Sequence, residues 1–293
     1  MKLIAFKRKN QLNPEIGVLT EQGAVPAVRC GITYPDMNTL IEKATAHEMD
    51  YLNRMANERR TPLEAGSYAL MSPIPYPKQD VICLGLNYKE HIEEAESYSS
   101  DAFELQKQNA VYFSKRASYC PGSGETVSSH SGLTEKLDYE AELAVIIGKE
   151  ACQVPEEDVK DYIFGYTVLN DLTARDVQTS HAQWYFGKSL DGFCPMGPCI
   201  VTADEVSWPP VLKIRSYVNG ELRQESDTGM LIHGIEEIVS ELSQGMRLMP
   251  GTIIATGTPK GTGMGLNPPV FLKPGDTVVC EIEGIGRLEN TIV

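Results

Sequence analysis

Residues 137–148, LDYEAELAVIIG, constrain the fold of this 293-residue chain more than any other stretch. If they form a β-strand, successive side chains point to opposite faces. One face then carries Glu140, Glu142, Ala144 and Ile146, and the other carries Tyr139, Ala141, Leu143, Val145 and Ile147. Because the second half of the stretch is apolar on both faces, we expect a strand that is covered on both sides.

The two glutamates at the start of this strand place like charges side by side. Burial would raise the pKa of each carboxyl unless a cation keeps the pair ionised. A single divalent metal ion would keep both carboxylates ionised. The alternative is a strand end that projects into solvent, and a Glu-x-Glu pair alone does not decide between the two.

Charge and cysteine content exclude several classes of function. The formal net charge of -14 argues against non-specific nucleic-acid binding and against a membrane-surface role. The seven cysteines include no Cys-x-x-Cys pair, so neither a zinc ribbon nor a disulfide framework is indicated. Residues 7–9 are basic where a signal peptide would need its apolar run, and no apolar segment reaches membrane-spanning length. We therefore expect a cytoplasmic protein that binds neither nucleic acid nor membrane.

The chain is expected to form two units. Residues 1–72 look like a small amino-terminal α/β unit, and residues 73–293 form a larger domain. The boundary lies at the proline-rich connector 73–77, because each proline disfavours helix in the residue before it.

The amino-terminal unit combines strands with one helix. Short strands are expected at residues 2–6 and 15–20. A long amphipathic helix should follow at about 40–57, with Thr39 and Glu42 as its capping box. The unit shows no catalytic constellation.

In the larger domain, a short apolar strand at residues 81–86 leads into an acidic segment. Asn87 and Glu90 have the spacing of a capping pair, so a helix is expected to begin here. His91 and Glu94 would then share a face, and the carboxylate would fix the imidazole tautomer, as in a general base and its orienter. The alternative is a solvated helix surface, because glutamates crowd this segment.

A second buried strand, residues 165–171, ends in Asp171, and the chain is expected to turn helical from Leu172. Asp171, Arg175 and Gln178 would then share one helical face, which suits a site that brings a metal ion and an anion together. The alternative is a local ion pair between Asp171 and Arg175.

Four other segments organise the rest of the domain. Residues 97–109 are a candidate mobile insertion, and residues 187–198 form a loop that carries Lys188. Asn219-Gly220 is the strongest hairpin signal. The glycine-rich run 257–265 matches no nucleotide-binding spacing, so it is interpreted as a loop in close approach to a ligand or a neighbouring strand.

With these residues laid out, the chain from about Val81 to its carboxyl end resembles the fumarylacetoacetate hydrolase family, in the branch of 2-hydroxyhepta-2,4-diene-1,7-dioate isomerase-like proteins. The resemblance rests on an ordered set of motifs: Gly85-Leu-Asn87-Tyr88-Lys-Glu-His91-Ile-Glu-Glu94, Phe113-Ser-Lys115, Tyr139-Glu140-Ala-Glu142-Leu, Asn170-Asp171-Leu-Thr-Ala-Arg175-Asp-Val-Gln178, Gly187-Lys188-Ser, Ala255-Thr-Gly257-Thr258-Pro259-Lys-Gly261 and Gly286-Arg-Leu-Glu-Asn290. Two positions depart from the family pattern, Arg116 and Thr262, and both are expected near the distal end of the substrate.

The resemblance implies a fold and a set of functional residues. The fold is α+β and mostly β, a mixed β-sandwich roll, and members are commonly homodimers. The metal ligands would be Glu140, Glu142 and Asp171, holding Mg²⁺ or Mn²⁺, with Ca²⁺ able to bind in vitro, and an all-carboxylate set independently favours a hard cation. The catalytic residues would be His91, Glu94 and Lys188, and the substrate-binding residues Lys115, Arg175, Gln178 and Thr258.

The leading hypothesis is a metal-dependent hydrolase that cleaves a carbon–carbon bond in a 2,4-dioxo acid, such as an acylpyruvate of aromatic catabolism. His91 would activate water, the pyruvate enolate would be stabilised by the metal and Lys188, and residues 97–109 would close as a lid. An oxaloacetate-type decarboxylase or a 2-hydroxy-2,4-dienedioate isomerase would use the same site. A third hypothesis is a non-catalytic protein that binds metal and small anionic oxo acids, which would not need His91 and Glu94.

Overall fold

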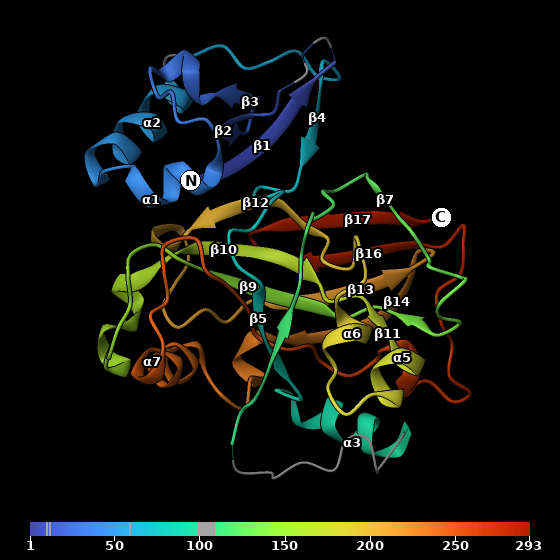
Figure 1. Cartoon of the computed structure of the whole chain (residues 1–293). Coiled ribbons are helices and arrows are strands. Elements are labelled where there is room, and N and C mark those ends of the chain that lie inside the picture. The colour runs from blue at the N-terminus through green and yellow to red at the C-terminus, as the bar shows by residue number, and fades with distance from the viewer. Residues whose placement is uncertain (10, 12, 59, 99–108) are drawn as a thin grey trace.

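The computed structural model describes residues 1–9, 11, 13–58, 60–98 and 109–293. Figure 1 shows a small amino-terminal unit above a larger body of stacked strands, with helix α3 at the opposite end. The strands are β1 Lys2–Arg8, β2 Glu15–Thr20, β3 Gly23–Pro26, β4 Tyr68–Met71, β5 Val81–Gly85, β6 Val111–Lys115, β7 Thr126–Val127, β8 Leu137–Asp138, β9 Ala141–Ile147, β10 Ile163–Asn170, β11 Thr173–Ala174, β12 Met196–Thr202, β13 Lys213–Val218, β14 Glu221–Asp227, β15 Ile253–Ala255, β16 Thr277–Ile282 and β17 Gly286–Ile292.

Helices are fewer and mostly peripheral. The α-helices are α1 Met37–Lys43, α2 Ala46–Glu58, α3 Lys89–Tyr98, α5 Arg175–Ser180, α6 Tyr185–Lys188 and α7 Ile235–Gly245. Short 3-10 helices are η1 Ala27–Cys30, η2 Glu156–Tyr162, η3 Ala203–Glu205, η4 Thr228–Met230 and η5 Gly263–Gly265.

Two sheets pack face to face in the larger body. The described residues form a ten-stranded sheet in the order β3-β2-β1-β12-β10-β9-β15-β5-β6, with β4 paired to β1, and a five-stranded sheet in the order β14-β13-β16-β17-β7. The strands β8 and β11 form a separate small pair. Most pairs are antiparallel, but β15 pairs parallel with β5 and β17 with β7, so the architecture is the expected mixed, mostly β sandwich roll.

Strand β9 lies at the centre of this sandwich and is fully buried along its length, as its apolar pattern predicts. The single strand expected at residues 137–148 is wrong in its bounds, because β8 pairs with β11 instead and residues 139 and 140 lie between β8 and β9. Leu143 and Val145 belong to a hydrophobic cluster that includes Ile214 of β13 and Cys280 of β16, so this face packs on the second sheet. Ala144 on the opposite face belongs to the other large cluster. The register of β9 is fixed, because a shift by one residue would turn Glu142 within the strand, and Glu140 directly before it, toward the opposite face.

The amino-terminal unit is joined to the larger body through β1. This strand pairs with β2 and β4 on its own side and with β12 through Leu3 opposite Ile200. The domain boundary at residues 72 and 73 stays a prediction, since the ten-stranded sheet runs through both units.

The single helix expected at residues 40–57 is wrong in detail, because the chain forms α1 and α2 with a break after Lys43. Asp36 caps α1 by accepting a hydrogen bond from the Thr39 N–H (2.7 Å), so Thr39 is not the cap. The capping box belongs to α2. The Thr45 hydroxyl accepts from the Glu48 N–H (3.2 Å), and the Glu48 carboxylate accepts from the Thr45 N–H (2.9 Å).

Two local predictions in the larger body are confirmed. Asn219 and Gly220 join β13 to β14 with φ angles of 52° and 81°, the left-handed conformation that such a two-residue turn requires. At Gly261 an added Cβ would lie 2.0 Å from the carbonyl oxygen of Arg223 on β14, so the glycine-rich run does approach a neighbouring strand closely.

Candidate active site

Neighbouring strands of the large sheet bring three carboxylates together. Strands β9 and β10 pair antiparallel with Asn170 opposite Ala141. Asp171 follows β10 directly, and its N–H donates to the carbonyl of Glu140 (2.9 Å). The Asn170 side-chain oxygen accepts from the Glu140 N–H (3.0 Å) and closes the same corner. The sheet register therefore places Asp171 beside Glu140 and Glu142.

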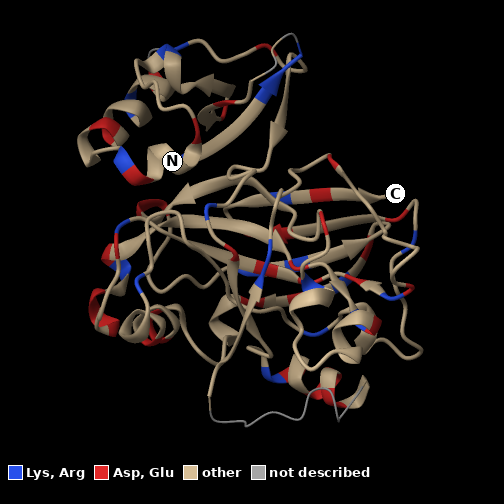
Figure 2. Ribbon diagram, viewed as in Figure 1, with Lys and Arg blue, Asp and Glu red and all other residues tan. Residues whose placement is uncertain are grey.

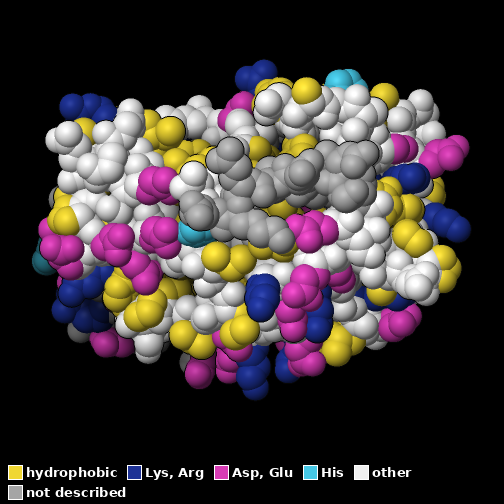
Figure 3. All heavy atoms as spheres, turned by 90° about the horizontal axis from the view of Figure 1, so that it is seen from below, with side chains coloured by type: hydrophobic (Ala, Val, Ile, Leu, Met, Phe, Trp, Pro, Cys, Tyr) yellow, Lys and Arg dark blue, Asp and Glu magenta, His cyan; other side chains and the backbone are white. Residues whose placement is uncertain are grey.

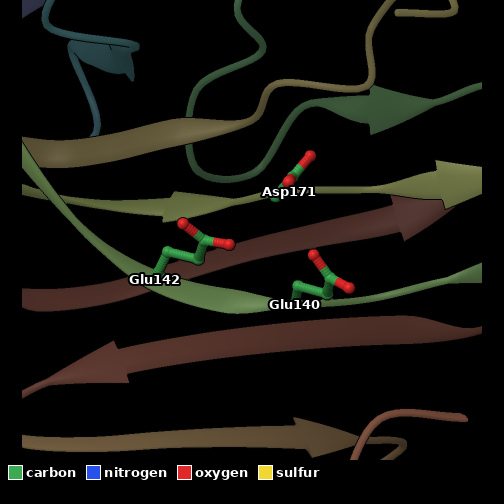
Figure 4. Close-up of side chains that lie close together, drawn as sticks. All are labelled: Glu140, Glu142 and Asp171. Carbon is green, nitrogen blue, oxygen red and sulfur yellow. The ribbon is translucent and has the colours of Figure 1, made fainter. Parts of the chain in front are cut away.

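Figure 4 shows the side chains of Glu140, Glu142 and Asp171 close together at this corner. One oxygen of each carboxylate lies within 4.8 Å of the others, and all three residues are buried. The two glutamates therefore do not project into solvent, so that alternative is wrong. Three buried carboxylates at this separation form the kind of oxygen donor set that hard divalent cations prefer.

Basic side chains contact two of the three carboxylates. Lys188 Nζ lies 2.6 Å from Glu140 Oε2 and 2.8 Å from Asp171 Oδ2. Arg175 Nη2 lies 2.6 Å from Glu140 Oε1, and Lys115 Nζ lies 2.7 Å from Asp171 Oδ1. Burial alone raises the pKa of the Glu140 carboxyl, but the charges of Lys188 and Arg175 outweigh it and hold that pKa well below its usual range. Asp171 thus pairs with the lysines, and the alternative of a local ion pair between Asp171 and Arg175 is wrong.

Glu142 has a different environment. Its Oε2 accepts a hydrogen bond from the Gly257 N–H (2.8 Å). Burial, and then the negative charges of Asp171 and Glu140, raise the pKa of this carboxyl well above its usual range. A divalent cation among the three carboxylates would stabilise the ionised form of Glu142 and lower its pKa again. The donor set and its charge therefore fit a metal ion such as Mg²⁺ or Mn²⁺.

Helix α3 places His91 and Glu94 against this cluster. His91 Nδ1 lies 3.3 Å from Glu94 Oε2, and His91 Nε2 lies 3.9 Å from Glu140 Oε1. Acidic positions are dense on α3 (Figure 2), but His91 is only 4% exposed, so the solvated-surface alternative is wrong for this residue. The imidazole therefore contacts the orienting carboxylate through one ring nitrogen and faces the cluster with the other.

A loop amide holds the orienting carboxylate. Glu94 Oε1 accepts from the Gly261 N–H (2.6 Å), which fixes α3 to the glycine-rich run. Hydrophobic and acidic side chains border the undescribed residues at this end of the molecule (Figure 3). The lid expected at 97–109 lies outside the described residues except for Ser97, Tyr98 and Asn109.

One cavity connects these groups. Its polar lining consists of His91, Glu140, Glu142, Arg175, Gln178, Lys188 and Thr258. Arg175 Nη1 donates to Gln178 Oε1 (3.2 Å), which joins two of the residues expected to bind the substrate. Thr258 Oγ1 donates to the Ala141 carbonyl (2.8 Å), so its hydroxyl is fixed at the cavity edge.

Lys115 lies behind the cavity. It is fully buried, and beyond its ion pair with Asp171 its Nζ donates to the carbonyls of Leu172 (2.9 Å) and Lys188. It is not among the described residues that line the cavity. In this arrangement Lys115 holds Asp171 and the end of α6 in place.

The uncharged wall of the cavity was missed by sequence reasoning. It consists of Leu84, Gly85, Leu86, Phe113 and Trp184. The rings of Phe113 and Trp184 pack edge to face at 5.5 Å. Phe113 belongs to the Phe-Ser-Lys motif and was a usable signal, whereas nothing in the local pattern marks Trp184.

Arg116 and Thr262 do not form this wall in the described part of the chain. The Arg116 side chain is exposed and pairs with Asp80 (3.4 Å), and Thr262 is buried beside Glu94. The expectation that they reach the distal end of the substrate therefore has no support in the cavity lining.

Three local predictions around the site are wrong. Asn87 does not cap α3, because its side chain instead donates to the carbonyls of His233 (3.1 Å) and Thr256 (2.9 Å). The chain does not turn helical at Leu172 either, because β11 comes first and α5 begins at Arg175. Lys188 is the last residue of α6 and not part of a loop.

Comparison with known proteins gives consistent matches. Residues 80–293 match the family described as Fumarylacetoacetate (FAA) hydrolase C-terminal. An oxaloacetate tautomerase of Bacillus subtilis (strain 168) is 45% identical over 223 residues, which cover 76% of this chain and 72% of that protein. Across the described residues, no helix has the length and apolar character needed to cross a membrane.

Solved structures align along the whole chain. A fumarylacetoacetate hydrolase from the psychrophilic Exiguobacterium antarcticum has a TM-score of 0.85 and 34% identity, with coverage of 100% of this chain and 99% of that one. A maleylpyruvate hydrolase from Sphingobium sp. SYK-6, in complex with a manganese(II) ion and pyruvate, has a TM-score of 0.76 and 30% identity, again covering 100% and 99%.

Proposed function

The chain belongs to the fumarylacetoacetate hydrolase family, whose members are enzymes acting on oxo acids, and we propose that it catalyses keto–enol interconversion of a small 2-oxo diacid such as oxaloacetate. The observation that carries this proposal is the position of His91, a buried acid–base group that faces the carboxylate cluster and its cations across one cavity. The name of the Bacillus subtilis relative supports the same reaction.

A divalent cation is part of the proposal. Glu140, Glu142 and Asp171 would hold it, and Mg²⁺ or Mn²⁺ fits their oxygen donors. When bound, the ion acts as a Lewis acid that polarises the 2-oxo group and favours the enolate. The manganese and pyruvate named for the Sphingobium enzyme support this assignment.

The protein side chains supply binding and proton transfer. Arg175 and Gln178 line the cavity together and bind the carboxylate next to the 2-oxo group. His91 removes a proton from the carbon adjacent to the carbonyl, while Glu94 stabilises the imidazolium that forms. Lys188, buried at the cluster, adds positive charge near the oxygen on which negative charge develops. Protonation of the enolate oxygen completes the formation of the enol. In the reverse direction the enol loses its O–H proton, and the His91 imidazolium returns a proton to carbon to give the keto form.

Hydrolytic cleavage of an acylpyruvate is the second candidate. The contact between His91 and Glu94 equally suits a base that activates water, and a maleylpyruvate hydrolase is among the structural relatives. Decarboxylation and dienedioate isomerisation pass through a comparable enolate, so a substrate panel has to separate these reactions.

The test uses the metal-loaded protein and four substrates: oxaloacetate, acetylpyruvate, fumarylpyruvate and a 2-hydroxy-2,4-dienedioate. We expect the protein loaded with Mn²⁺ or Mg²⁺ to accelerate the decay of enol-oxaloacetate without releasing pyruvate. The decay is followed by the ultraviolet absorbance of the enol. Metal-stripped protein is the control.

The other outcomes of the panel contradict the proposal. Pyruvate released from the acylpyruvates without tautomerase activity would favour the hydrolase. Formation of pyruvate and carbon dioxide from oxaloacetate would favour the decarboxylase. Rearrangement of the dienedioate, with no reaction of the other substrates, would favour the isomerase. Tight oxalate binding without any turnover would favour a non-catalytic binding protein.

A further inference from the structure

A fourth buried acid lies next to the carboxylate cluster but outside its donor set. Asp138, the last residue of β8, has no exposed surface. It is neither among the described residues that could share a metal ion nor among those that line the cavity. A buried carboxylate is costly unless it is fully paired, so its contacts indicate what it does.

Both oxygens of Asp138 are occupied by protein donors. Oδ1 accepts from the N–H groups of Tyr139 (2.9 Å) and Gly263 (2.6 Å). Oδ2 accepts from the Met264 N–H (3.1 Å) and from Arg175 Nε (2.8 Å). Three backbone amides therefore hold the carboxylate rigidly, and Arg175 is its one side-chain hydrogen-bond partner among the described residues.

Arg175 in turn connects Asp138 to the site. Its Nε contacts Asp138, its Nη2 contacts Glu140 Oε1 (2.6 Å) and its Nη1 contacts Gln178 (3.2 Å). The guanidinium is planar, so fixing the Nε edge sets the direction in which the two Nη groups point into the cavity. Asp138 is thus the anchor for the orientation of Arg175.

The same contact affects Glu140. Arg175 and Lys188 both pair with this carboxylate, and both compete there with a metal ion. Because Asp138 also forms an ion pair with Arg175, it weakens the electrostatic attraction between that guanidinium and Glu140. Without the Asp138 charge, Arg175 would have Glu140 as its remaining carboxylate partner and would hold it more tightly.

We propose that Asp138 is a positioning residue that aims Arg175 into the cavity and keeps Glu140 available to the metal ion. The metal part of this proposal rests on the proposed function. The glycine-rich run takes part through its backbone: an added Cβ at Gly263 would lie 2.7 Å from Asp138 Oδ1 and 2.2 Å from the Val270 carbonyl oxygen, so a side chain there would displace the amide that holds Asp138.

The test replaces Asp138 by Asn, which keeps the shape and removes the charge. We expect the Mn²⁺ affinity of the metal-free protein, measured by calorimetric titration, to fall by about 10- to 100-fold, the usual cost of losing a partner that supports a metal ligand. The KM for the 2-oxo acid should rise by a similar factor while kcat changes less, because Arg175 serves binding more than proton transfer.

Asp176→Asn is the matched control. Like Asp138, Asp176 is an acid whose carboxylate accepts hydrogen bonds from neighbouring donors. These are Thr134 Oγ1 (2.5 Å), the Glu135 N–H (3.0 Å) and the Val177 N–H (2.9 Å). The Asp176 carboxylate pairs with neither the Arg175 guanidinium nor the cluster. Its variant should lose stability and keep wild-type Mn²⁺ affinity and KM. A purely structural role for Asp138 would give D138N this same behaviour and would overturn the proposal.

A double-mutant cycle tests the route through Arg175. In an Arg175→Gln background, D138N should no longer change the Mn²⁺ affinity, and a full effect in that background would contradict the proposal. If D138N does not fold, Asp138→Glu, which keeps the charge and displaces the carboxylate, should show the same rise in KM with little change in kcat, and a wild-type KM would overturn the proposal. Mn²⁺ affinity is measured without substrate, so failure of the proposed reaction stays distinguishable from failure of this one.

Discussion

The carboxylate cluster and the His91–Glu94 pair meet at one cavity, which Glu140, Glu142 and His91 line, but they are held in different ways. The cluster stands on β9 and β10 in the middle of the ten-stranded sheet, where both faces are buried. The pair stands on α3 at one end of the molecule, directly before the undescribed residues 99–108. Its described ties to the rest of the site are the Gly261 and Thr262 contacts of Glu94 and the approach of His91 to Glu140.

This difference separates two tasks. A metal ion needs ligands whose positions do not change during turnover, and a central strand pair supplies them. A proton-transfer group has to meet a substrate that enters and leaves, and a peripheral helix with few ties to the sheet suits that task. Metal binding and turnover should therefore respond independently to substitutions in the two regions.

The largest expected effect comes from Glu142→Gln in the cluster. Removing one of three carboxylates should weaken Mn²⁺ binding by more than the roughly 100-fold that loss of a supporting partner costs, and turnover should disappear with it. The metal-free variant should unfold at no lower temperature than the wild type, because a neutral amide replaces a carboxyl that burial makes costly to ionise. Calorimetric titration and thermal unfolding check both parts, and unchanged Mn²⁺ affinity would remove Glu142 from the donor set.

The next effect separates the two regions. His91→Ala should lower kcat by roughly 10²- to 10⁴-fold, the usual contribution of a positioned acid–base group, and leave Mn²⁺ affinity nearly intact. Glu90→Gln on the same helix is the control, because Glu90 is exposed and pairs with Lys260 (3.1 Å). Steady-state kinetics with Mn²⁺ measure kcat for both variants. A wild-type kcat for the Ala variant would show that His91 is not the base.

The smallest effect concerns pH and belongs to the cluster alone. Since burial and neighbouring negative charges raise the pKa of Glu142, this carboxyl keeps its proton to higher pH than an ordinary glutamate, and a metal ion has to displace that proton. Mn²⁺ affinity should therefore rise with pH, by up to about ten-fold per unit, until Glu142 ionises without metal. Titrations in two buffers with different ionisation enthalpies measure the released protons, and zero release would contradict the raised pKa.

The same shift predicts how the stability of the metal-free protein depends on pH. The folded pKa of Glu142 lies above the unfolded one, so unfolding releases a proton at intermediate pH. The free energy of unfolding should fall as pH rises from the unfolded value through the folded value. Bound Mn²⁺ should remove this loss, which denaturant titrations with and without metal can measure.

The sequence predicted those parts of the fold that depend on neighbours along the chain. The period-two pattern of β9 and the Asn219-Gly220 turn are local signals, and both were predicted correctly. Asn87 shows the limit. Its side-chain amide donates hydrogen bonds to the carbonyls of His233 and Thr256, more than 140 residues away. These long-range hydrogen bonds replace the helix cap that the local spacing favoured.

The candidate site shows the same division. The family motifs named the three carboxylates and the His91–Glu94 pair, and the structure brings all five together. The partner of each cation was not predictable from spacing: Arg175 and Asp171 are four residues apart, yet Arg175 pairs with Asp138 and Glu140 across the β8–β11 corner. Trp184 was missed because only folding brings it against Phe113 on β6.

The glycine-rich run 257–265 reaches three acids of the site through peptide N–H groups, Glu142 from Gly257, Glu94 from Gly261 and Asp138 from Gly263. The Lys260 side chain takes no part in these contacts, so this exposed position can be redesigned freely. The three donors, by contrast, are glycines at which an added Cβ would lie 2.0 to 2.8 Å from a neighbouring atom, so alanine at any of them would displace the peptide N–H that holds an acid of the site.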